Sequence, residues 1–155
     1  MDLQLVALPI HRFLAWMERS AREYEADLLR LGHDAASAAA DARKSLALAF
    51  PDGSPAAGQA VFDLVAADGE PVGYLWVGPD SSGDPTQWWV WDVVVDEAHR
   101  GKGYGKQAMR LAEEHARGRG ATSIGLSVFG FNKPAQGLYE SLGFETTSIK
   151  MRKWV

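Results

Sequence analysis

The stretch that decides the fold is Val93–Lys106, VVVDEAHRGKGYGK, where a β-branched apolar run breaks into a glycine-rich turn and then a helix. Three glycines take alternate positions: Gly101, Gly103 and Gly105. Glycine allows backbone conformations closed to other residues and a close approach of a ligand, so successive N–H groups can converge on one anion. Three cations add charge: Arg100, Lys102 and Lys106. With the positive end of the following helix, expected over 104–119, this stretch predicts a cradle for phosphate.

Upstream of the cradle, the hydrophobic pattern predicts one strand and two helices. A short apolar run at 3–8, stopped by Pro9, is a first strand. A long helix ending at Gly32 is expected from apolar residues at three- and four-residue steps: Ile10, Phe13, Leu14, Met17, Ala21, Tyr24, Leu28 and Leu31. Its other face is charged and expected to be solvated: Glu18, Arg19, Arg22, Glu23, Glu25 and Asp27. Asp34 can cap a second, alanine-rich helix that runs to Ala49.

The rest of the chain predicts a sheet with further helices. Strands are expected at 59–67 and 71–77, joined by a tight turn, and at 87–96, where apolar residues on both faces indicate a central strand. Alternation along that strand separates Trp89, Trp91, Val93 and Val95 from Trp88, Val90, Asp92 and Val94. The helix at 104–119 and a strand at 122–128 make a parallel crossover. A short helix at 133–142, capped by Asn132, and a last strand at 144–154 complete the expected elements.

Composition and charge limit the class of protein. The chain has 155 residues, 46% of them apolar, which suits one domain over 1–155. Without cysteine there are no disulfides or thiolate metal sites, and the four histidines lack ligand spacing, so no metal is expected. No apolar run approaches the roughly 20 residues of a membrane span, and the N-terminus does not resemble a signal peptide, so we expect a cytoplasmic protein without a membrane partner. A net charge of -4 argues against nucleic-acid binding.

Two common phosphate loops do not fit the cradle. A P-loop needs a glycine four residues before Gly-Lys-Ser/Thr, but Arg100 stands at that place and Gln107 follows Lys106. The dinucleotide fingerprint needs Gly-x-Gly-x-x-Gly, whereas the three glycines alternate. The spacing therefore indicates neither ATP nor a nicotinamide dinucleotide.

What fits is Arg100-x-x-Gly103-x-Gly105 after the strand, followed by a second block from Asn132 to Phe144, NKPAQGLYESLGF. This pair of blocks resembles the GCN5-related N-acetyltransferases (GNAT family). The resemblance implies an α+β fold with a mixed, mostly antiparallel sheet that splays beside the central strand, flanked by helices, in a single N-acetyltransferase domain. It also implies acetyl-CoA as cosubstrate, lying in the gap of the sheet.

The resemblance assigns roles to residues of both blocks. Val93, Val94 and Val95 form the strand segment that would pair with the pantetheine arm through the backbone of Val93 and Val95. The pyrophosphate would bind to the cradle: Arg100, Gly101, Lys102, Gly103, Tyr104, Gly105 and Lys106. Asn132 would bond the cofactor near the pantetheine, or act as a helix cap, or both. Tyr139 would protonate the departing thiolate, because a phenol with a pKa of about 10 keeps its proton at neutral pH.

The general base and the acceptor are less determined. Asp92 is the remaining acid of the central strand, on the face opposite Val93 and Val95, while a water chain or a base from the first two helices is equally compatible. We expect a primary amine to attack the thioester in a ternary complex. The amine, a small molecule or a peptide, would bind between these helices and the loop 78–86, lined partly by tryptophans. A non-catalytic acyl-CoA-binding module is the alternative, and the sequence leaves a homodimer open.

Overall fold

Five short runs rich in β-branched and aromatic residues form one sheet, in the order β1-β2-β3-β4-β5. The computed structural model describes residues 2–155. The strands are β1 (Gln4–Ala7), β2 (Ala60–Val65), β3 (Pro71–Pro79), β4 (Gln87–Val95) and β5 (Ser123–Leu126). The pairs from β1 to β4 are antiparallel, and β5 runs parallel to β4. The predicted α+β fold with a mixed, mostly antiparallel sheet is therefore confirmed.

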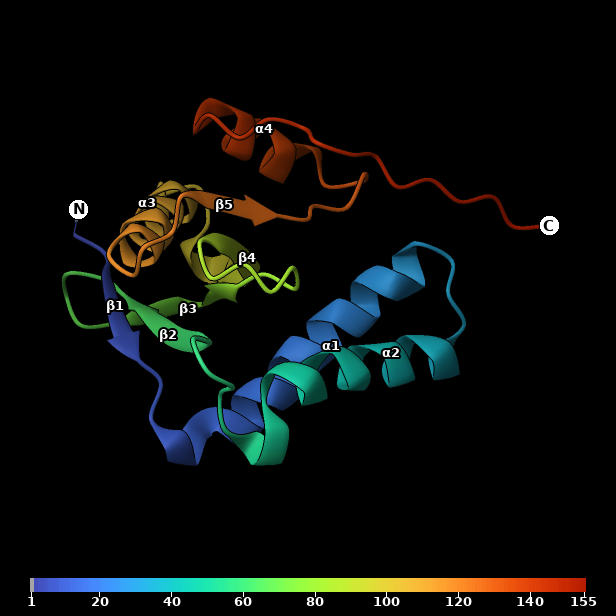
Figure 1. The fold of residues 1–155 in the computed structure, drawn as a ribbon, viewed down its shortest axis with the longest axis horizontal. Coiled ribbons are helices and arrows are strands. Elements are labelled where there is room, and N and C mark those ends of the chain that lie inside the picture. The colour runs from blue at the N-terminus through green and yellow to red at the C-terminus, as the bar shows by residue number, and fades with distance from the viewer. Residues whose placement is uncertain (1) are drawn as a thin grey trace.

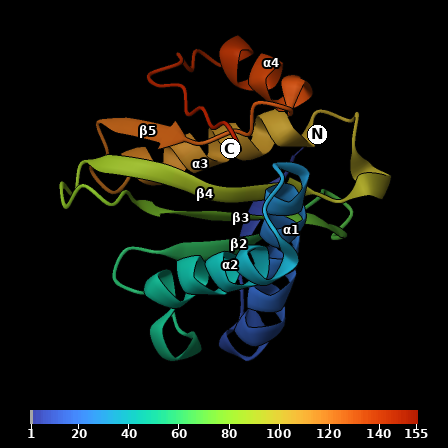
Figure 2. The ribbon, with the colours of Figure 1, turned by 90° about the vertical axis from the view of Figure 1, so that its right-hand side faces the viewer.

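Four helices lie on the two faces of this sheet: α1 (Phe13–Arg30), α2 (Ala35–Ala49), α3 (Tyr104–Arg117) and α4 (Lys133–Ser141). Figure 1 shows α3 on one side of the strands and α1 with α2 on the other, and Figure 2 shows α1 and α2 in front of the sheet. Asp34 caps α2 as predicted, because its carboxylate accepts from the Ser37 N–H at 2.9 Å. Among residues 2–155, we find no helix with the length and apolarity needed to cross a membrane.

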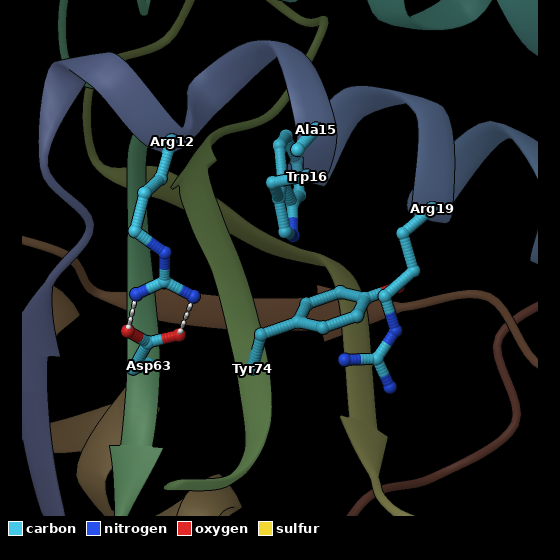
Figure 3. A pocket seen from close by; sticks show the side chains of 6 residues that line it. All are labelled: Arg12, Ala15, Trp16, Arg19, Asp63 and Tyr74. Carbon is cyan, nitrogen blue, oxygen red and sulfur yellow. Dashed lines mark hydrogen bonds and ion pairs between the residues drawn. The ribbon is translucent and has the colours of Figure 1, made fainter.

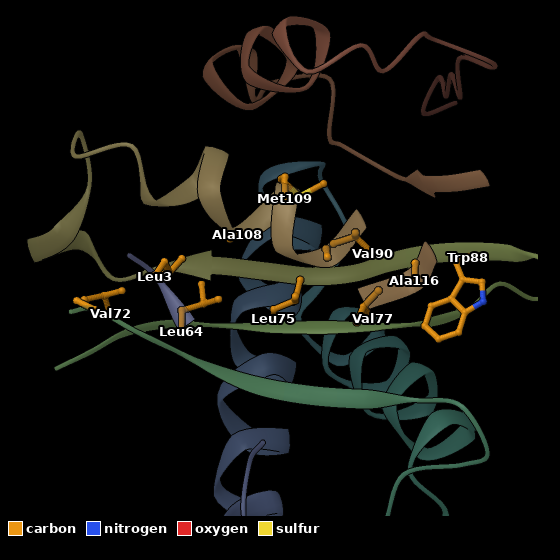
Figure 4. Close-up of a cluster of buried hydrophobic side chains, with 12 residues drawn as sticks. Leu3, Leu64, Val72, Leu75, Val77, Trp88, Val90, Ala108, Met109 and Ala116 are labelled. Atoms are coloured by element: carbon orange, nitrogen blue, oxygen red, sulfur yellow. The ribbon is translucent and has the colours of Figure 1, made fainter. Parts of the chain in front are cut away.

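Under α3 the sheet is aliphatic. The buried positions of α3 are Ala108, Met109, Ala112 and Ala116, three of them small, which lets the helix lie close to the strands. They pack on buried side chains of β2, β3 and β4 (Figure 4), among them Leu64, Leu75, Val77 and Val90. We call this side of the sheet the aliphatic face.

Under α1 and α2 the sheet is aromatic, and we call this side the aromatic face. The Trp16 ring contacts four others, those of Phe13, Phe50, Tyr74 and Trp76, with centroids 5.2–6.2 Å apart. The predicted stripe of α1 is confirmed at Phe13 and Leu28, which are buried, and wrong at four other positions, which are exposed: Ile10, Leu14, Tyr24 and Leu31. Trp16 and Ser20, which the stripe leaves out, are buried. The chain makes a 3-10 turn over Ile10–Arg12 before α1 begins, and this tighter turn shifts the phase of the helix.

A β-bulge at Trp91 changes the alternation expected for β4. Trp76 pairs with Asp92 and Val77 with Val90, so Trp91 has no partner on β3. An extra residue on one strand shifts all later side chains to the other face. Val93 therefore packs on the aliphatic face together with Val90, whereas Val94 packs on the aromatic face. The predicted division of β4 into two faces is therefore wrong for the residues after Trp91 relative to those before it. Asp92 and Val93 do lie on opposite faces, as predicted.

Strands β4 and β5 pair only over their first halves. The register runs from Gln87 with Ser123 to Val90 with Leu126, where β5 ends while β4 continues to Val95. The second half of β4 thus keeps β3 on one side and no strand on the other, within residues 2–155. This is the splayed gap that the resemblance implies.

The predicted last strand at 144–154 is wrong, because residues 142–155 have no regular secondary structure. We call residues 144–155 the C-terminal arm; it extends from α4 past the body of the molecule (Figure 1). A strand needs a partner for its backbone groups, and none of the described strands pairs with the arm. The sequence of the arm favours a strand, but a local pattern does not show whether a partner strand is present.

Candidate functional site

The cradle is a turn of left-handed glycines that leads into α3. Gly101 and Gly103 have φ angles of 77° and 83°, a region that residues with a Cβ rarely adopt. The first backbone hydrogen bond of α3 runs from the Gln107 N–H to the Gly103 carbonyl at 3.2 Å, so the three N–H groups before it, at 104–106, have no partner within the helix. Gly105 is helical and lies against α4, where a Cβ would be 3.3 Å from Leu138. The turn therefore presents free donors at the positive end of a helix.

The three cations of the cradle are exposed, and one of them also braces the turn. The Arg100 Nε donates to the Val95 carbonyl at 3.0 Å and so connects the turn to the end of β4. Lys102 and Lys106 carry their charge on either side of Gly103. The arrangement suits a ligand with several negative charges.

The open edge of β4 is adjacent to this turn. The Asp96 N–H donates to the Val72 carbonyl on β3 at 2.8 Å, so by antiparallel alternation Val94 faces β3 while Val93 and Val95 face the gap with their backbone groups. The Val95 carbonyl accepts the hydrogen bond from Arg100. The Val95 N–H and the N–H and C=O of Val93 therefore face the gap without a strand partner among residues 2–155. Of the three predicted valines, the structure brings Val93 and Val95 to the gap and turns the backbone of Val94 away from it.

Asn132 and Tyr139 come from α4, on the other side of the gap. The Asn132 side chain accepts from the Ala135 N–H at 3.3 Å, so its predicted role as a helix cap is confirmed. The Tyr139 ring packs on Phe144, with centroids 5.9 Å apart, and against the aliphatic face. Burial, and then the charge of Asp92, raise the pKa of the Tyr139 phenol. The phenol therefore stays protonated at neutral pH and lies within electrostatic reach of Asp92.

Asp92 projects from β4 into a polar cluster on the aromatic face. Its Oδ2 accepts from the Ser20 hydroxyl at 2.8 Å and from the Tyr74 hydroxyl at 2.6 Å. Burial raises the pKa of the Asp92 carboxyl above its ordinary range, although both hydrogen bonds lower it. A carboxyl group whose pKa is raised by burial beside specific partners is a candidate for proton exchange.

Helix α1 adds charge around this cluster. Tyr74 also lies 3.3 Å from a carboxylate oxygen of Glu23, and Arg19 binds Asp96 at 2.6 Å. Asp27 is partly buried, which raises its pKa. The charged face of α1 is thus not simply solvated as expected, because Arg19 and Glu23 contact residues of the sheet.

Indole rings extend from the core to the surface beside Asp92. Trp76 stacks on Trp91 at 5.8 Å, and Trp91 lies 6.3 Å from Trp89. Trp89 covers Gly125 of β5, where a Cβ would be 2.5 Å from the ring. Trp76 and Trp91 also line a hollow of ≈ 190 Å³ between α2 and the loop that follows β3, together with Leu48, Gln59 and Asp80. This hollow lies where the sequence predicts the acceptor site.

A second hollow, of ≈ 170 Å³, lies at the start of α1 (Figure 3). It is lined by Arg12, Trp16, Arg19, Asp63 and Tyr74, and its two cations are paired, Arg12 with Asp63 and Arg19 with Asp96. Paired cations have little capacity left for a ligand, so we assign no role to it. Within residues 2–155, no group of three histidine, aspartate or glutamate side chains is placed to bind a metal ion.

Sequence reasoning missed Ser20, Glu23 and Tyr74 as members of the site. Their contacts to each other and to Asp92 join positions 18 to 72 residues apart. Ser20 follows the buried Trp16 by four residues, so a polar residue on the buried face of α1 was the available signal. Nothing in the local sequence distinguishes Tyr74 from an ordinary apolar residue of a strand.

Comparison with known proteins agrees with this geometry. The family model described as "Acetyltransferase (GNAT) family" matches residues 15–144. The chain is 37% identical to the uncharacterized N-acetyltransferase YycN of Bacillus subtilis over 53% of either chain, and 32% identical to the uncharacterized N-acetyltransferase YdgE of the same organism over 67% of this chain and 66% of YdgE. The matched stretches thus span about half to two thirds of these relatives. The crystal structure of YycN superposes with a TM-score of 0.90 at 25% identity, covering 99% of both chains.

Proposed function

Because the chain belongs to the acetyltransferase (GNAT) family, we propose that it transfers an acetyl group from acetyl-CoA directly to a primary amine. The observation that carries the proposal is the open end of β4, where β5 stops pairing at Leu126 and the backbone groups of Val93 and Val95 that face the gap lie next to the glycine turn at the start of α3. Two titratable groups border this region, Asp92 of β4 and Tyr139 of α4, and burial raises the pKa of both. We assign Asp92 to accept a proton and Tyr139 to donate one.

The gap and the cradle suit acetyl-CoA. The free N–H groups at 104–106 and the exposed Arg100, Lys102 and Lys106 match a pyrophosphate in charge and donor number. Beside them, Val93 and Val95 offer unpaired strand groups to an amide-containing arm, as an edge strand does for a peptide. Acetyl-CoA supplies a thioester, whose carbonyl carbon an amine can attack.

Tyr139 is the proposed acid. When the amine nitrogen bonds to the acetyl carbon and the carbon–sulfur bond breaks, the sulfur gains negative charge, and Tyr139 donates a proton to it. The new amide nitrogen then releases its extra proton, which balances the proton that Tyr139 gives up. Its hydroxyl makes no protein hydrogen bond among the described residues, so it is available for this contact. Tyr74, the buried tyrosine of the site, donates its one proton to Asp92 at 2.6 Å and is not available in this way.

Asp92 is the proposed base. An ammonium must lose a proton before it can attack, and the Asp92 carboxylate accepts it. Ser20 and Tyr74 both bond Oδ2, so these two contacts leave Oδ1 for the substrate. The donors also fix the orientation of the carboxylate. No covalent enzyme intermediate is required, since nitrogen attacks the acetyl carbon while both substrates are bound.

The acceptor is a cationic amine of small or moderate size. Two carboxyl groups, those of Asp92 and Glu23, lie 2.6 and 3.3 Å from the Tyr74 hydroxyl. Asp27 lies one turn beyond Glu23 on α1, and its charge also raises the pKa of Asp92. The hollow beside Trp76 and Trp91 adds two stacked aromatic rings, which attract cations over their faces. A peptide or polyamine with neighbouring positive charges fits these surroundings better than an acidic amine.

The test is an acceptor screen that measures free CoA released from acetyl-CoA with polyamines, lysine peptides, aminoglycosides and an acidic amine such as glutamate. We expect release with at least one cationic amine and no release above hydrolysis with glutamate. Tyr139→Phe should lower kcat with that amine about 100-fold or more. Calorimetry should show unchanged acetyl-CoA affinity, since the ring remains.

The matched control is Tyr24→Phe, which removes a hydroxyl from an exposed tyrosine of α1 that stacks on Phe129. It should leave kcat within a few-fold. Acetyl-CoA binding without transfer to any amine would instead identify a binding module, and an absence of binding at millimolar acetyl-CoA would refute the whole proposal.

A further inference from the structure

The guanidinium group of Arg19, on α1, contacts three residues around the polar cluster of the aromatic face. Its Nη2 donates to Asp96 at 2.6 Å, its Nε lies 3.5 Å from Glu23, and its Cζ lies 5.0 Å from the centre of the Tyr74 ring. Figure 3 shows the Arg19 side chain beside that ring. The three partners belong to the turn after β4, to α1 and to β3. The proposed reaction gives this guanidinium no role of its own.

Two of these partners act on Asp92, the proposed base. The Tyr74 hydroxyl donates to the Asp92 carboxylate at 2.6 Å and lies 3.3 Å from Glu23. Burial is the main cause of the raised pKa of Asp92; the hydrogen bond from Tyr74 lowers this pKa, and the charge of Glu23 raises it further. Arg19 therefore contacts both residues through which these two opposing effects reach the base.

Asp96 anchors the guanidinium in one place. The backbone of Asp96 is itself fixed, because its N–H donates to the Val72 carbonyl and its carbonyl accepts from the His99 N–H, both at 2.8 Å. The side chains of Arg19 and Asp96 are only 39% and 35% exposed. A lone ion pair at the surface contributes little, but a network of several charges is held more firmly. Arg19 is thus restrained beside the Tyr74 ring.

The groups that face Asp92 come from every element packed against it. They are Ser20, Glu23 and Asp27 of α1, Tyr74 of β3, and Tyr139 of α4, whose phenol is within reach of the Asp92 charge. Two of these groups are carboxyls, and none of them is a cation. The positive charge of Arg19 reaches this group through its pairing with Glu23.

We propose that Arg19 is a positioning residue for the base: its guanidinium holds the Glu23 carboxylate and the Tyr74 ring in the places from which both act on Asp92. The cation offsets part of the Glu23 charge. Its position near the Tyr74 ring is a favourable cation–π contact, which restrains the hydroxyl that bonds to Asp92. The inference rests on the proposed function, because it takes Asp92 as the base. The role requires no contact between Arg19 and either substrate.

The first test titrates the Asp92 carboxyl group by carbon NMR in the absence of substrates, with its signal identified by its loss in Asp92→Asn. In Arg19→Gln the Glu23 charge is no longer paired, so the pKa of Asp92 should rise by about 0.5 pH unit or more. Adding Glu23→Gln to this variant should reverse the rise, because the charge itself is gone. Arg22→Gln, at an exposed position of α1, is the matched control and should leave the titration unchanged.

Turnover provides the second readout. In Arg19→Gln the acidic limb of kcat/KM, measured as CoA release, should move to higher pH together with the NMR titration. Arg19→Lys keeps the charge, so its limb should stay near the wild-type position. If Arg19 served only to stabilise the fold, Arg19→Gln would lower the Tm and leave the limb where it is.

The two readouts separate this inference from the proposed function. An unchanged Asp92 titration in folded Arg19→Gln, or a rise that Glu23→Gln does not reverse, would overturn the role of Arg19 even in a chain that releases CoA. The expected NMR shifts in a chain that releases no CoA with any amine would support the action of Arg19 on Asp92 and refute the proposed function instead.

Discussion

The two faces of the sheet are built from different chemistry. On the aliphatic face, α3 buries three alanines and a methionine on leucine and valine side chains. His115 lies on this face, 5.0 Å from Phe62 and 5.8 Å from Trp88. Burial lowers the pKa of its ring, which favours the neutral form. On the aromatic face, a carboxyl group, two hydroxyls and the charges of α1 converge beneath a layer of rings.

This difference shows where the free energy of folding and the chemistry are located. Burying aliphatic side chains lowers the free energy of the folded state and does not remove polar groups from water. The contacts between α3 and its strands therefore mainly stabilise the fold. Burying Asp92 is unfavourable unless it is bonded, and the aromatic face retains it with two donors. We therefore expect substitutions at the buried positions of α3 to change stability and substitutions in the polar cluster of the aromatic face to change turnover. Tyr139 is the exception, because it packs against the aliphatic face and is the proposed acid.

The largest effect is expected on the aromatic face, from Asp92→Asn. Loss of the proposed base should lower kcat/KM about 10²- to 10⁴-fold, measured as CoA release with the best amine of the screen. Asp52→Asn, at an exposed position in the turn after α2, is the matched control and should leave the rate unchanged.

The same variant should not lose stability. The pKa of Asp92 is raised in the folded protein, so the stability that it contributes is present at acidic pH and is lost as the pH rises through the raised pKa. At neutral pH the ionised form is therefore unfavourable, and a neutral amide that still accepts from Ser20 and Tyr74 should give an equal or higher Tm. A large fall in Tm would contradict the division between the two faces.

The next effect is expected on the aliphatic face, from Met109→Ala. Met109 is 2% exposed, and truncating such a side chain costs about 2–5 kcal/mol, part of which depends on the cavity left behind. Urea unfolding should show this as a lower midpoint, with kcat per folded molecule unchanged. Leu29→Ala, at a position that is 44% exposed on α1, should change stability much less. A fall in kcat without a fall in stability would mean that Met109 takes part in the chemistry, which would contradict its assignment to the core.

The smallest effect is expected from Tyr74→Phe, which removes one donor from Asp92 and leaves the ring. The rate at the pH optimum should fall no more than about tenfold, the value of roughly one hydrogen bond. Because the bond from Tyr74 lowers the pKa of Asp92, its loss should raise that pKa, and the acidic limb of kcat/KM should move to higher pH. A merely structural role for Tyr74 would lower the rate without moving this limb.

Local patterns in the sequence predicted the cradle and most elements. Alternate glycines indicate a turn wherever they occur, and Gly101 and Gly103 do adopt positive φ angles. Caps at Asp34 and Asn132 depend on residues three positions away, so they too could be found without a structure. The placement of Asp92 opposite Val93 was also predicted, since neighbouring residues of a strand point to opposite faces.

What the sequence could not supply depends on partners distant along the chain. The bulge at Trp91 is defined by its pairing with β3, and period-two alternation has no means of placing it. Ser20 joins the site through a contact 72 residues away. The C-terminal arm has strand-like residues, yet whether they form a strand is decided by an edge that the local sequence does not describe.

The indole rings beside Asp92 also make the protein its own optical reporter. Trp16, Trp76, Trp91 and Trp89 follow one another at 5.7, 5.8 and 6.3 Å, close enough for excitation energy to pass from ring to ring. The sequence of rings leads from the buried Trp16 to Trp91, which is 37% exposed at the hollow. A molecule that quenches or shields Trp91 therefore changes the fluorescence of light absorbed by several of these rings. Acceptor binding can then be followed by intrinsic fluorescence without a label.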